Sequence, residues 1–304
     1  MNRIGHLDIG PLRLNFRADG FGPVRYSAPG HRQFFISAGH QTGPEALCEM
    51  TLELTRQRTL LPAGEPLWRG GQSWAVWAAG MDLLCCSGFQ VPGRARFGCR
   101  VARDLSRAEL ALDPDWAAAH EDGQESPLRF PLDQILAWGM LSRIGGALMH
   151  AAVVVRDGQG WVLAGRSGAG KSTLAALCHA EGWRVLNDDR AIVFRRGGEW
   201  RVAGTPWHGT GRFAEAAEVP LEGIFLLRQA AFEHLHALPV SQARLALLDV
   251  AAVPWFEDSW AQGTLDGLNQ LAEEMTPGQF YFTKNQAAVQ ALTDYSRPRS
   301  GACA

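Results

Sequence analysis

The sequence VLAGRSGAGKSTLAALCHAEGWRVLNDD, at residues 162–189, decides the fold that we expect for this chain. It opens with a short apolar run at 162–164 and continues through a glycine-rich turn at 165–170. An amphipathic segment follows and ends at Gly182. This order predicts a strand, a loop and a helix, because short apolar runs favour strands and helix-spaced apolar residues favour helices.

The glycine-rich turn has the pattern of a phosphate-binding loop. Glycine accepts positive φ and lets the backbone approach a ligand closely, and the N-terminus of the following helix adds partial positive charge. In the pattern G-x-x-x-x-G-K-[ST], the lysine contacts the β- and γ-phosphates and the Ser172 hydroxyl binds Mg²⁺. The alternative, a glycine turn without a ligand, does not account for the flanking strand and helix. We predict that ATP binds to Gly165, Arg166, Ser167, Gly168, Ala169, Gly170, Lys171, Ser172 and Thr173.

A histidine precedes this loop on a second expected strand, at residues 149–155, which a turn at 156–160 connects to the first. If Val155 lies opposite Trp161 in a hairpin, counting back places His150 opposite Arg166. A slip of one or two residues changes the partner but leaves His150 beside the loop. A lone histidine on an apolar strand is otherwise a core residue, so the register decides between the two interpretations.

Two acidic residues follow the next expected strand, at 183–186, which ends in Asn187-Asp188-Asp189-Arg190. A helix joins this strand to the first one in a right-handed parallel crossover, so the acids should lie level with Lys171 at the carboxyl ends of the strands. Successive side chains face opposite ways on extended backbone. One aspartate can therefore bind Mg²⁺ while the other accepts a proton from an attacking hydroxyl. The alternative is a pair of turn aspartates.

A small, polar loop at residues 204–212 follows a further expected hairpin. His208 and Arg212 are available there to contact an acceptor or the transferred phosphoryl group. A plain surface loop is an equally good interpretation of these residues.

The composition is that of a folded protein without a strong charge. Hydrophobic residues make up 46% and charged residues 20% of the 304 residues, and the net charge of −2 provides no bulk attraction to nucleic acid or membranes. The six cysteines form no C-x-x-C pair and no zinc-like spacing with histidine, as in a protein of the reducing cytoplasm. The longest apolar run, 147–155, is too short to span a bilayer, and the N-terminus lacks the apolar core of a signal peptide. We expect a cytoplasmic protein.

The rest of the chain suggests two domains. Short apolar runs between glycines and prolines predict a β-rich module, in which Trp68, Trp74 and Trp77 are packing residues rather than a ligand platform, and His31 and His40 are solvated. Helices are expected at 132–148, 244–249, 265–275 and 285–292, and a strand at 220–227. The expected divisions are a β-rich module at 1–115, a linker and helix at 116–146, a nucleotide core at 147–295 and a disordered tail at 296–304.

Together these residues resemble HPr kinase/phosphorylase and related serine kinases, which share a nucleotide core with phosphoenolpyruvate carboxykinases. The resemblance rests on the histidine of the preceding strand, the loop, and an Asp-Asp pair that ends seventeen residues after Ser172. It covers roughly residues 147–227, and weaker matches occur at 131–133, 204–207 and 282–285. The chain also looks like the HPr-kinase-related proteins found beside bacterial peptide-modification systems, including lasso-peptide kinases.

The resemblance implies an α/β fold, with a P-loop kinase core of the HPr kinase/phosphoenolpyruvate carboxykinase type and a β-rich N-terminal module. It further implies that Asp188 helps Ser172 to hold Mg²⁺, that Asp189 is the base acting on a serine hydroxyl, and that His150 lies near the phosphates. The family's L-E-x-R-G stretch and its arginine-bearing loop for docking HPr are not found, so HPr itself is not the expected acceptor.

The function that we predict is ATP- and Mg²⁺-dependent phosphorylation of a hydroxyl, with a serine of a peptide or small protein as the favoured acceptor. Catalysis would involve Asp189, His150, Lys171 and Arg212. Two alternatives are a nucleotide-dependent regulatory or assembly module without transfer, and a small-molecule kinase. No nucleic-acid or membrane partner is expected, and the sequence leaves a homo-oligomer open.

Overall fold

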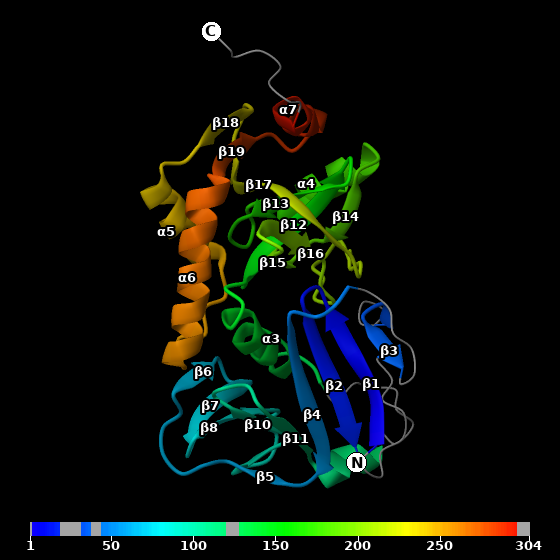
Figure 1. Cartoon of the computed structure of the whole chain (residues 1–304), viewed down its shortest axis with the longest axis vertical. Helices are drawn as coiled ribbons and strands as arrows, with labels where there is room; N and C mark the ends of the chain where they lie inside the picture. Colours follow the sequence, from blue (N-terminus) through cyan, green and yellow to red (C-terminus); the bar gives the residue numbers. More distant parts are fainter. Residues whose placement is uncertain (1, 19–31, 38–43, 120–127, 297–304) are drawn as a thin grey trace. The chain divides into compact units, whose positions relative to one another are not determined.

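The computed structural model describes residues 2–18, 32–37, 44–119 and 128–296. The fold is mixed α/β and rich in strands (Figure 1). The chain forms two compact units, Met1–Gly146 with Val253–Leu265, and Ala147–Ala252 with Asp266–Ala304. The expectations for His31, His40 and residues 297–304 lie outside the described residues, and the sequence-based domain boundaries stay a prediction.

The first unit contains a nine-stranded sheet in the order β3-β1-β2-β4-β11-β10-β8-β7-β6. As the sequence predicts, this part of the chain is β-rich. Hairpins join β1 to β2, β7 to β8 and β10 to β11, whereas β4 pairs in parallel with both β2 and β11. The strands are β1 (Asn2–Ile9), β2 (Leu12–Ala18), β3 (Phe35–Ser37), β4 (Cys48–Arg56), β6 (Trp68–Gly70), β7 (Trp74–Ala79), β8 (Asp82–Ser87), β10 (Phe97–Ala102) and β11 (Ala108–Leu112), and a separate pair comprises β5 (Thr59–Leu60) and β9 (Arg94–Ala95).

Two helices of this unit correct the sequence-based expectations. The helix expected at 132–148 is shorter: α3 (Leu132–Ser142) ends before Gly145, which has a φ of 62°, and Ala147 begins a strand. Leu148 is apolar because it pairs across the sheet with Ile192, not because it continues a helix face. The linker expected from residue 116 overlaps a short helix, α2 (Pro114–Ala119), and residues 120–127 lie outside the described residues.

The tryptophans of the first unit divide into two groups. Trp74 and Trp77 are buried, at 7% and 6% exposed, whereas Trp68 is 40% exposed. Trp74 packs against Trp138 of α3 with ring centroids 6.3 Å apart, and Trp77 packs against Phe89 at 6.4 Å. Two of the three therefore have the packing role that the sequence suggested.

The second unit is built around two long strands that each pair with several neighbours. Strand β12 pairs with β15 through its first residues and with β13 and β14 through its last ones, and β17 pairs with β16, β13 and β19. Because β15 also pairs with β16, the strands β12, β13, β17, β16 and β15 close into a ring. The strands are β12 (Ala147–Arg156), β13 (Gln159–Ala164), β14 (Arg184–Asn187), β15 (Arg190–Arg196), β16 (Glu199–Ala203), β17 (Glu218–Gln229), β18 (His234–Ala237) and β19 (Gly278–Phe282).

Helix α4 (Lys171–Ala180) connects β13 to β14 and packs on the sheet through Leu174, Ala175 and Cys178, which are all fully buried. Both strands are antiparallel to β12, so they run parallel to each other, as expected, but β12 lies between them. The other helices are longer than the sequence predicts: α5 (Val240–Val250), α6 (Asp258–Met275) and α7 (Gln286–Ser296). No helix in the described part of the chain is long and apolar enough to cross a membrane.

The ring of strands leaves no space for a side chain at Gly160 of β13. A Cβ atom there would lie 2.5 Å from Val202 and 2.8 Å from Val219, on two other strands of the ring. Gly160→Val should therefore lower the free energy of unfolding of this unit by about 1–3 kcal/mol, the range for overpacking. Urea unfolding measures this, with the adjacent Gln159→Val as the control. Equal stability of the two variants would contradict the closed ring.

Candidate active site

The glycine-rich loop lies between the end of β13 at Ala164 and the first residue of α4 at Lys171. Gly168 and Gly170 have φ values of 81° and 102°, which disfavour residues with a side chain. A Cβ atom at Gly170 would also lie 2.7 Å from the Phe282 ring. The expected order of strand, loop and helix is present, and the two glycines occupy positions that other residues would strain.

Lys171 places its ammonium group inside this loop. The side chain is buried, and Nζ donates hydrogen bonds to the carbonyl oxygens of Gly165 and Arg166, at 2.9 and 3.1 Å. Burial lowers the pKa of Lys171 to about 8, although the negative charge of Asp189 acts in the opposite direction. A poorly hydrated cation beside the N-terminus of α4 is an environment that fits a bound phosphate group.

Two residues outside the loop support it, and neither was identified from the sequence. The Gln229 side chain at the end of β17 donates a hydrogen bond to the Gly168 carbonyl at 2.6 Å. Asp249 of α5 forms an ion pair with Arg166, with a separation of 2.7 Å between Nε and Oδ2. These contacts border a cavity of about 630 Å³ that is lined by the loop, the end of β17 and α5. Both partners are distant in sequence, so no local pattern indicates them.

His150 and Asp189 form a close pair beside the loop. His150 Nε2 lies 3.1 Å from Asp189 Oδ1, and the carbonyl of His150 accepts a hydrogen bond from the N–H of Gly165 at 3.3 Å. Burial raises the pKa of Asp189, but the hydrogen bond from His150 and the positive charges of Arg190, His150 and Lys171 outweigh it and lower the pKa overall. Asp189 is thus an ionised, oriented carboxylate that remains partly exposed.

The register between β12 and β13, which places His150, differs by one residue from the register expected from the sequence. Val154, not Val155, lies opposite Trp161, so His150 is next to Gly165 rather than opposite Arg166. The reason is the turn: Arg156 pairs with Gln159 around a two-residue turn, in which Asp157 and Gly158 both have positive φ. Asp-Gly is a sequence signal for such a turn and would have given the correct register. The expectation that His150 lies beside the loop is unaffected.

Asp188 contacts a different partner from Asp189, as the alternation of an extended backbone predicts. Its side chain is buried, and Oδ1 and Oδ2 accept hydrogen bonds from the N–H groups of Gly209 and Gly211, at 2.8 and 2.6 Å. The backbone carbonyl of Asp188 lies 3.5 Å from the Ser172 hydroxyl. The carboxylate therefore connects the end of β14 to the loop at 204–212.

That loop has a second connection to the same strand end. The buried Asn187 amide donates a hydrogen bond to the Thr205 hydroxyl at 3.2 Å, and this hydroxyl donates one to the carbonyl of Arg190. His208 and Arg212 are exposed, and Arg212 has a φ of 59°. Neither Asn187 nor Thr205 was among the predicted site residues, because they are eighteen positions apart and no local pattern connects them.

The described residues contain no group of three or more histidine, cysteine, aspartate or glutamate side chains that could hold a metal ion by themselves. Near the loop, the partly exposed oxygen donors include the Ser172 hydroxyl and the Asp189 carboxylate, whereas the Asp249 carboxylate is paired with Arg166. This small donor set fits Mg²⁺, which binds through few protein groups and takes its other ligands from phosphates and water. It does not fit a metal site made of protein ligands alone.

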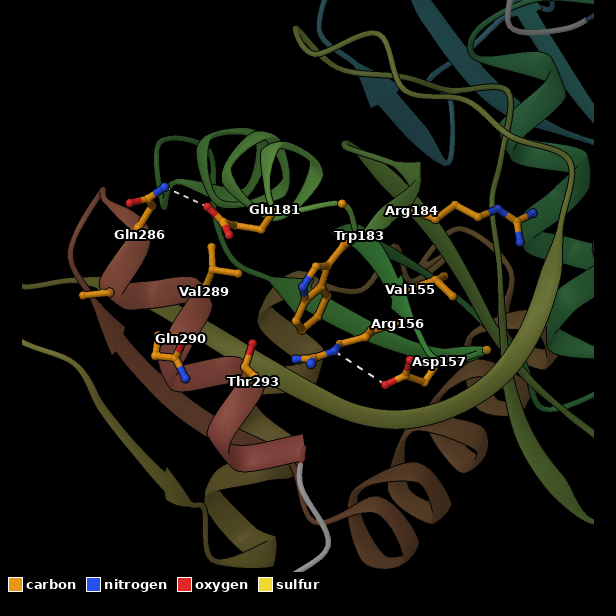
Figure 2. Close-up of a pocket in the computed structure, with 13 residues that line it drawn as sticks. Val155, Arg156, Asp157, Glu181, Trp183, Arg184, Gln286, Val289, Gln290 and Thr293 are labelled. Atoms are coloured by element: carbon orange, nitrogen blue, oxygen red, sulfur yellow. Dashed lines mark hydrogen bonds and ion pairs between the residues drawn. The ribbon is translucent and has the colours of Figure 1, made fainter.

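A second cavity, of about 890 Å³, lies at the opposite end of α4, where the β12–β13 turn approaches α7. Figure 2 shows Arg156 between Trp183 and Asp157, and the Arg156 guanidinium carbon is 5.3 Å from the Trp183 ring centroid. Glu181 and Gln286 also bond to each other, at 2.7 Å. This cavity is the larger one, but it contains none of the predicted site residues, and α4 separates it from the loop by about 15 Å.

Comparisons with known proteins give two similarities. Residues 134–274, less than half of the chain, match the model of a family described as SynChlorMet cassette protein ScmC. Among solved structures, the chain is similar to the Hpr(Ser) kinase/phosphatase from Coxiella burnetii, with 11% sequence identity and a TM-score of 0.29, over 51% of this chain and 99% of that one. So low a TM-score carries no argument about function. No curated protein matches the chain.

Replacing His150 should change the ionisation of Asp189. His150→Ala removes a hydrogen bond and a positive charge that stabilise the carboxylate, while burial continues to oppose ionisation, so the pKa of Asp189 should rise. Carbon-13 NMR of the aspartate carboxyl groups as a function of pH measures this, with Asp189→Asn to assign the signal. His179→Ala on α4, whose ring packs against Phe213, is the control and should leave the Asp189 pKa unchanged. An unchanged or lowered pKa in His150→Ala would refute the pairing.

Proposed function

We propose that this chain is an ATP- and Mg²⁺-dependent kinase that phosphorylates a hydroxyl, most specifically a serine of a peptide or small protein. The observation that carries the proposal is the combination of two features that lie beyond the ends of β13 and β14. One is the desolvated ammonium of Lys171 within the glycine-rich loop, and the other is the oriented carboxylate of Asp189 beside it. Phosphoryl transfer requires charge neutralisation and positioning of the nucleophile, which these two features supply.

The loop would bind the β- and γ-phosphates of ATP. Its backbone N–H groups and the N-terminus of α4 favour an anion, and Lys171 would exchange its hydrogen bonds to carbonyl oxygens for bonds to phosphate oxygens. The Ser172 hydroxyl, in the first turn of α4, would hold Mg²⁺. When bound, Mg²⁺ neutralises negative charge on the phosphates.

Asp189 would act on the acceptor hydroxyl. Its carboxylate accepts the hydroxyl proton as the oxygen attacks the γ-phosphorus and the bond from that phosphorus to the β,γ-bridging oxygen breaks, which leaves a phosphoester and ADP. The low pKa of Asp189 makes it a weak base, but in phosphoryl transfer the carboxylate has mainly to orient the nucleophile. The contact with His150 would maintain that orientation.

The net charge and the family match support the proposed class of acceptor. The net charge of −2 provides no steering toward a highly charged partner, which favours a short, largely neutral peptide that presents one serine. The matched family is described as a cassette protein, so products of neighbouring genes are the first acceptors to test.

The direct test is to incubate the protein with Mg²⁺–ATP and peptides encoded nearby, and to detect one added phosphate by mass spectrometry. Lys171→Ala should abolish transfer and weaken ATP binding, because it removes the buried charge that contacts the phosphates. The chain contains one other lysine, the exposed Lys284, and Lys284→Ala is the matched control. Ample transfer by Lys171→Ala would refute the role of the loop. If ATP binds but no peptide or small hydroxyl compound is modified, the regulatory interpretation replaces the kinase.

A further inference from the structure

We propose that Asp188 is a positioning residue, whose carboxylate fixes the loop at residues 204–212 so that this loop can recognise the acceptor. We name this segment the acceptor loop. The role of this loop in recognising an acceptor rests on the proposed kinase function. The anchoring of the loop by Asp188 does not depend on that function. It replaces the sequence-based expectation that Asp188 helps to hold Mg²⁺.

The acceptor loop surrounds the Asp188 carboxylate with backbone hydrogen-bond donors. Both oxygens accept backbone N–H groups, from Gly209 at 2.8 Å and from Gly211 at 2.6 Å, and the residue is 1% exposed. A Cβ atom on Gly209 or Gly211 would lie 2.9 or 2.8 Å from Oδ2. The absence of side chains at the two glycines therefore leaves room for the Asp188 carboxylate. Its hydrogen bonds to the backbone are charge-assisted and so stronger than neutral ones.

The same strand end holds the start of the acceptor loop. Thr205, which is fully buried, receives a hydrogen bond from Asn187 and donates one to the carbonyl of Arg190. Three residues around the end of β14 thus hold the acceptor loop near its beginning and again at Gly209 and Gly211. Such double anchoring restricts the loop but leaves Arg212 exposed.

The acceptor loop presents one free cation close to the phosphate-binding loop. Arg212 is exposed, and its guanidinium makes no ion pair or hydrogen bond with the described residues. The loop's anchor is adjacent to the first turn of α4, because the Asp188 carbonyl lies 3.5 Å from the Ser172 hydroxyl. A free cation on a fixed loop at this position suits contact with an acceptor or with the phosphoryl group that is transferred to it.

Burial argues against Asp188 as a ligand of Mg²⁺. A carboxylate that binds Mg²⁺ has to face the phosphates and ordered water, since this ion retains several waters and dehydrates reluctantly. Asp188 is almost completely buried and directs both oxygens into the acceptor loop, whereas Asp189 remains about one third exposed, at 32%. Of the two aspartates, Asp189 is therefore the one that offers partly exposed oxygens beside the Ser172 hydroxyl.

Asp188→Asn tests the anchoring directly. Asparagine keeps the size of the side chain but turns an N–H group toward one backbone N–H group, so one charge-assisted hydrogen bond is lost. Limited digestion with trypsin should then release the fragment that ends at Arg212 about 10-fold faster or more than in the wild type, as expected for such a loss. The Mg²⁺ dependence of ATP binding should change less than about 2-fold. Asp189→Asn, which has no bond to the acceptor loop, is the control and should not speed cleavage at Arg212.

A second variant keeps the test decisive if Asp188→Asn does not fold. Gly211→Ala leaves Asp188 intact but adds a Cβ atom 2.8 Å from its carboxylate, and it should expose Arg212 to trypsin in the same way. Where an acceptor is known, both variants should raise its KM while the KM for ATP stays constant. Unchanged cleavage at Arg212, or a loss of Mg²⁺ affinity of more than about 10-fold, overturns the proposal. Since the cleavage assay needs no acceptor, failure of the kinase function would be seen separately.

Discussion

The pairing of β12 along its whole length is the constraint on which the rest of the second unit depends. One strand bonds to β15 at its start and to β13 and β14 further on, so three other strands are fixed relative to it. As a consequence, the end of β13, the start of β15 and His150 meet at one edge. The glycine-rich loop follows the end of β13, and the Asp188-Asp189 pair lies between β14 and β15. The candidate site is therefore assembled by backbone hydrogen bonds, and the side chains occupy positions that the pairing sets.

The site places charge where it is costly in the absence of a ligand. Lys171 is desolvated, and within the described residues its ammonium donates only to carbonyl oxygens. A buried charge of this kind persists in a fold when binding compensates for its cost, and perturbed pKa values cluster at functional sites. In the proposed kinase, the phosphates of ATP would provide that compensation. Of Asp188 and Asp189, only Asp189 is partly exposed, and the hydrogen bond from His150 helps to keep its carboxylate ionised.

The sequence predicts local features of this protein better than distant contacts. The strand, loop and helix at 162–182 follow from residues that are adjacent in the chain, and so does the opposite orientation of Asp188 and Asp189. The helix expected at 132–148 was too long because apolar residues that belong to β12 continued its periodicity. The hydrogen bonds from Gly209 and Gly211 to Asp188, and from Gln229 to Gly168, join residues that are more than twenty positions apart. No spacing rule connects them, so they required the three-dimensional structure.

The central claim is that the loop at 165–173 binds nucleotide phosphates, and amide NMR of the nitrogen-15-labelled protein tests it most directly. Titration with ATP in the presence of Mg²⁺ should shift the amide signals of Gly168, Gly170 and Lys171, because their N–H groups would surround the phosphates. AMP, which lacks the β- and γ-phosphates, should shift them much less. The account would be contradicted if ATP left these signals unchanged, or if its largest shifts fell on the other cavity, around Arg156 and Trp183.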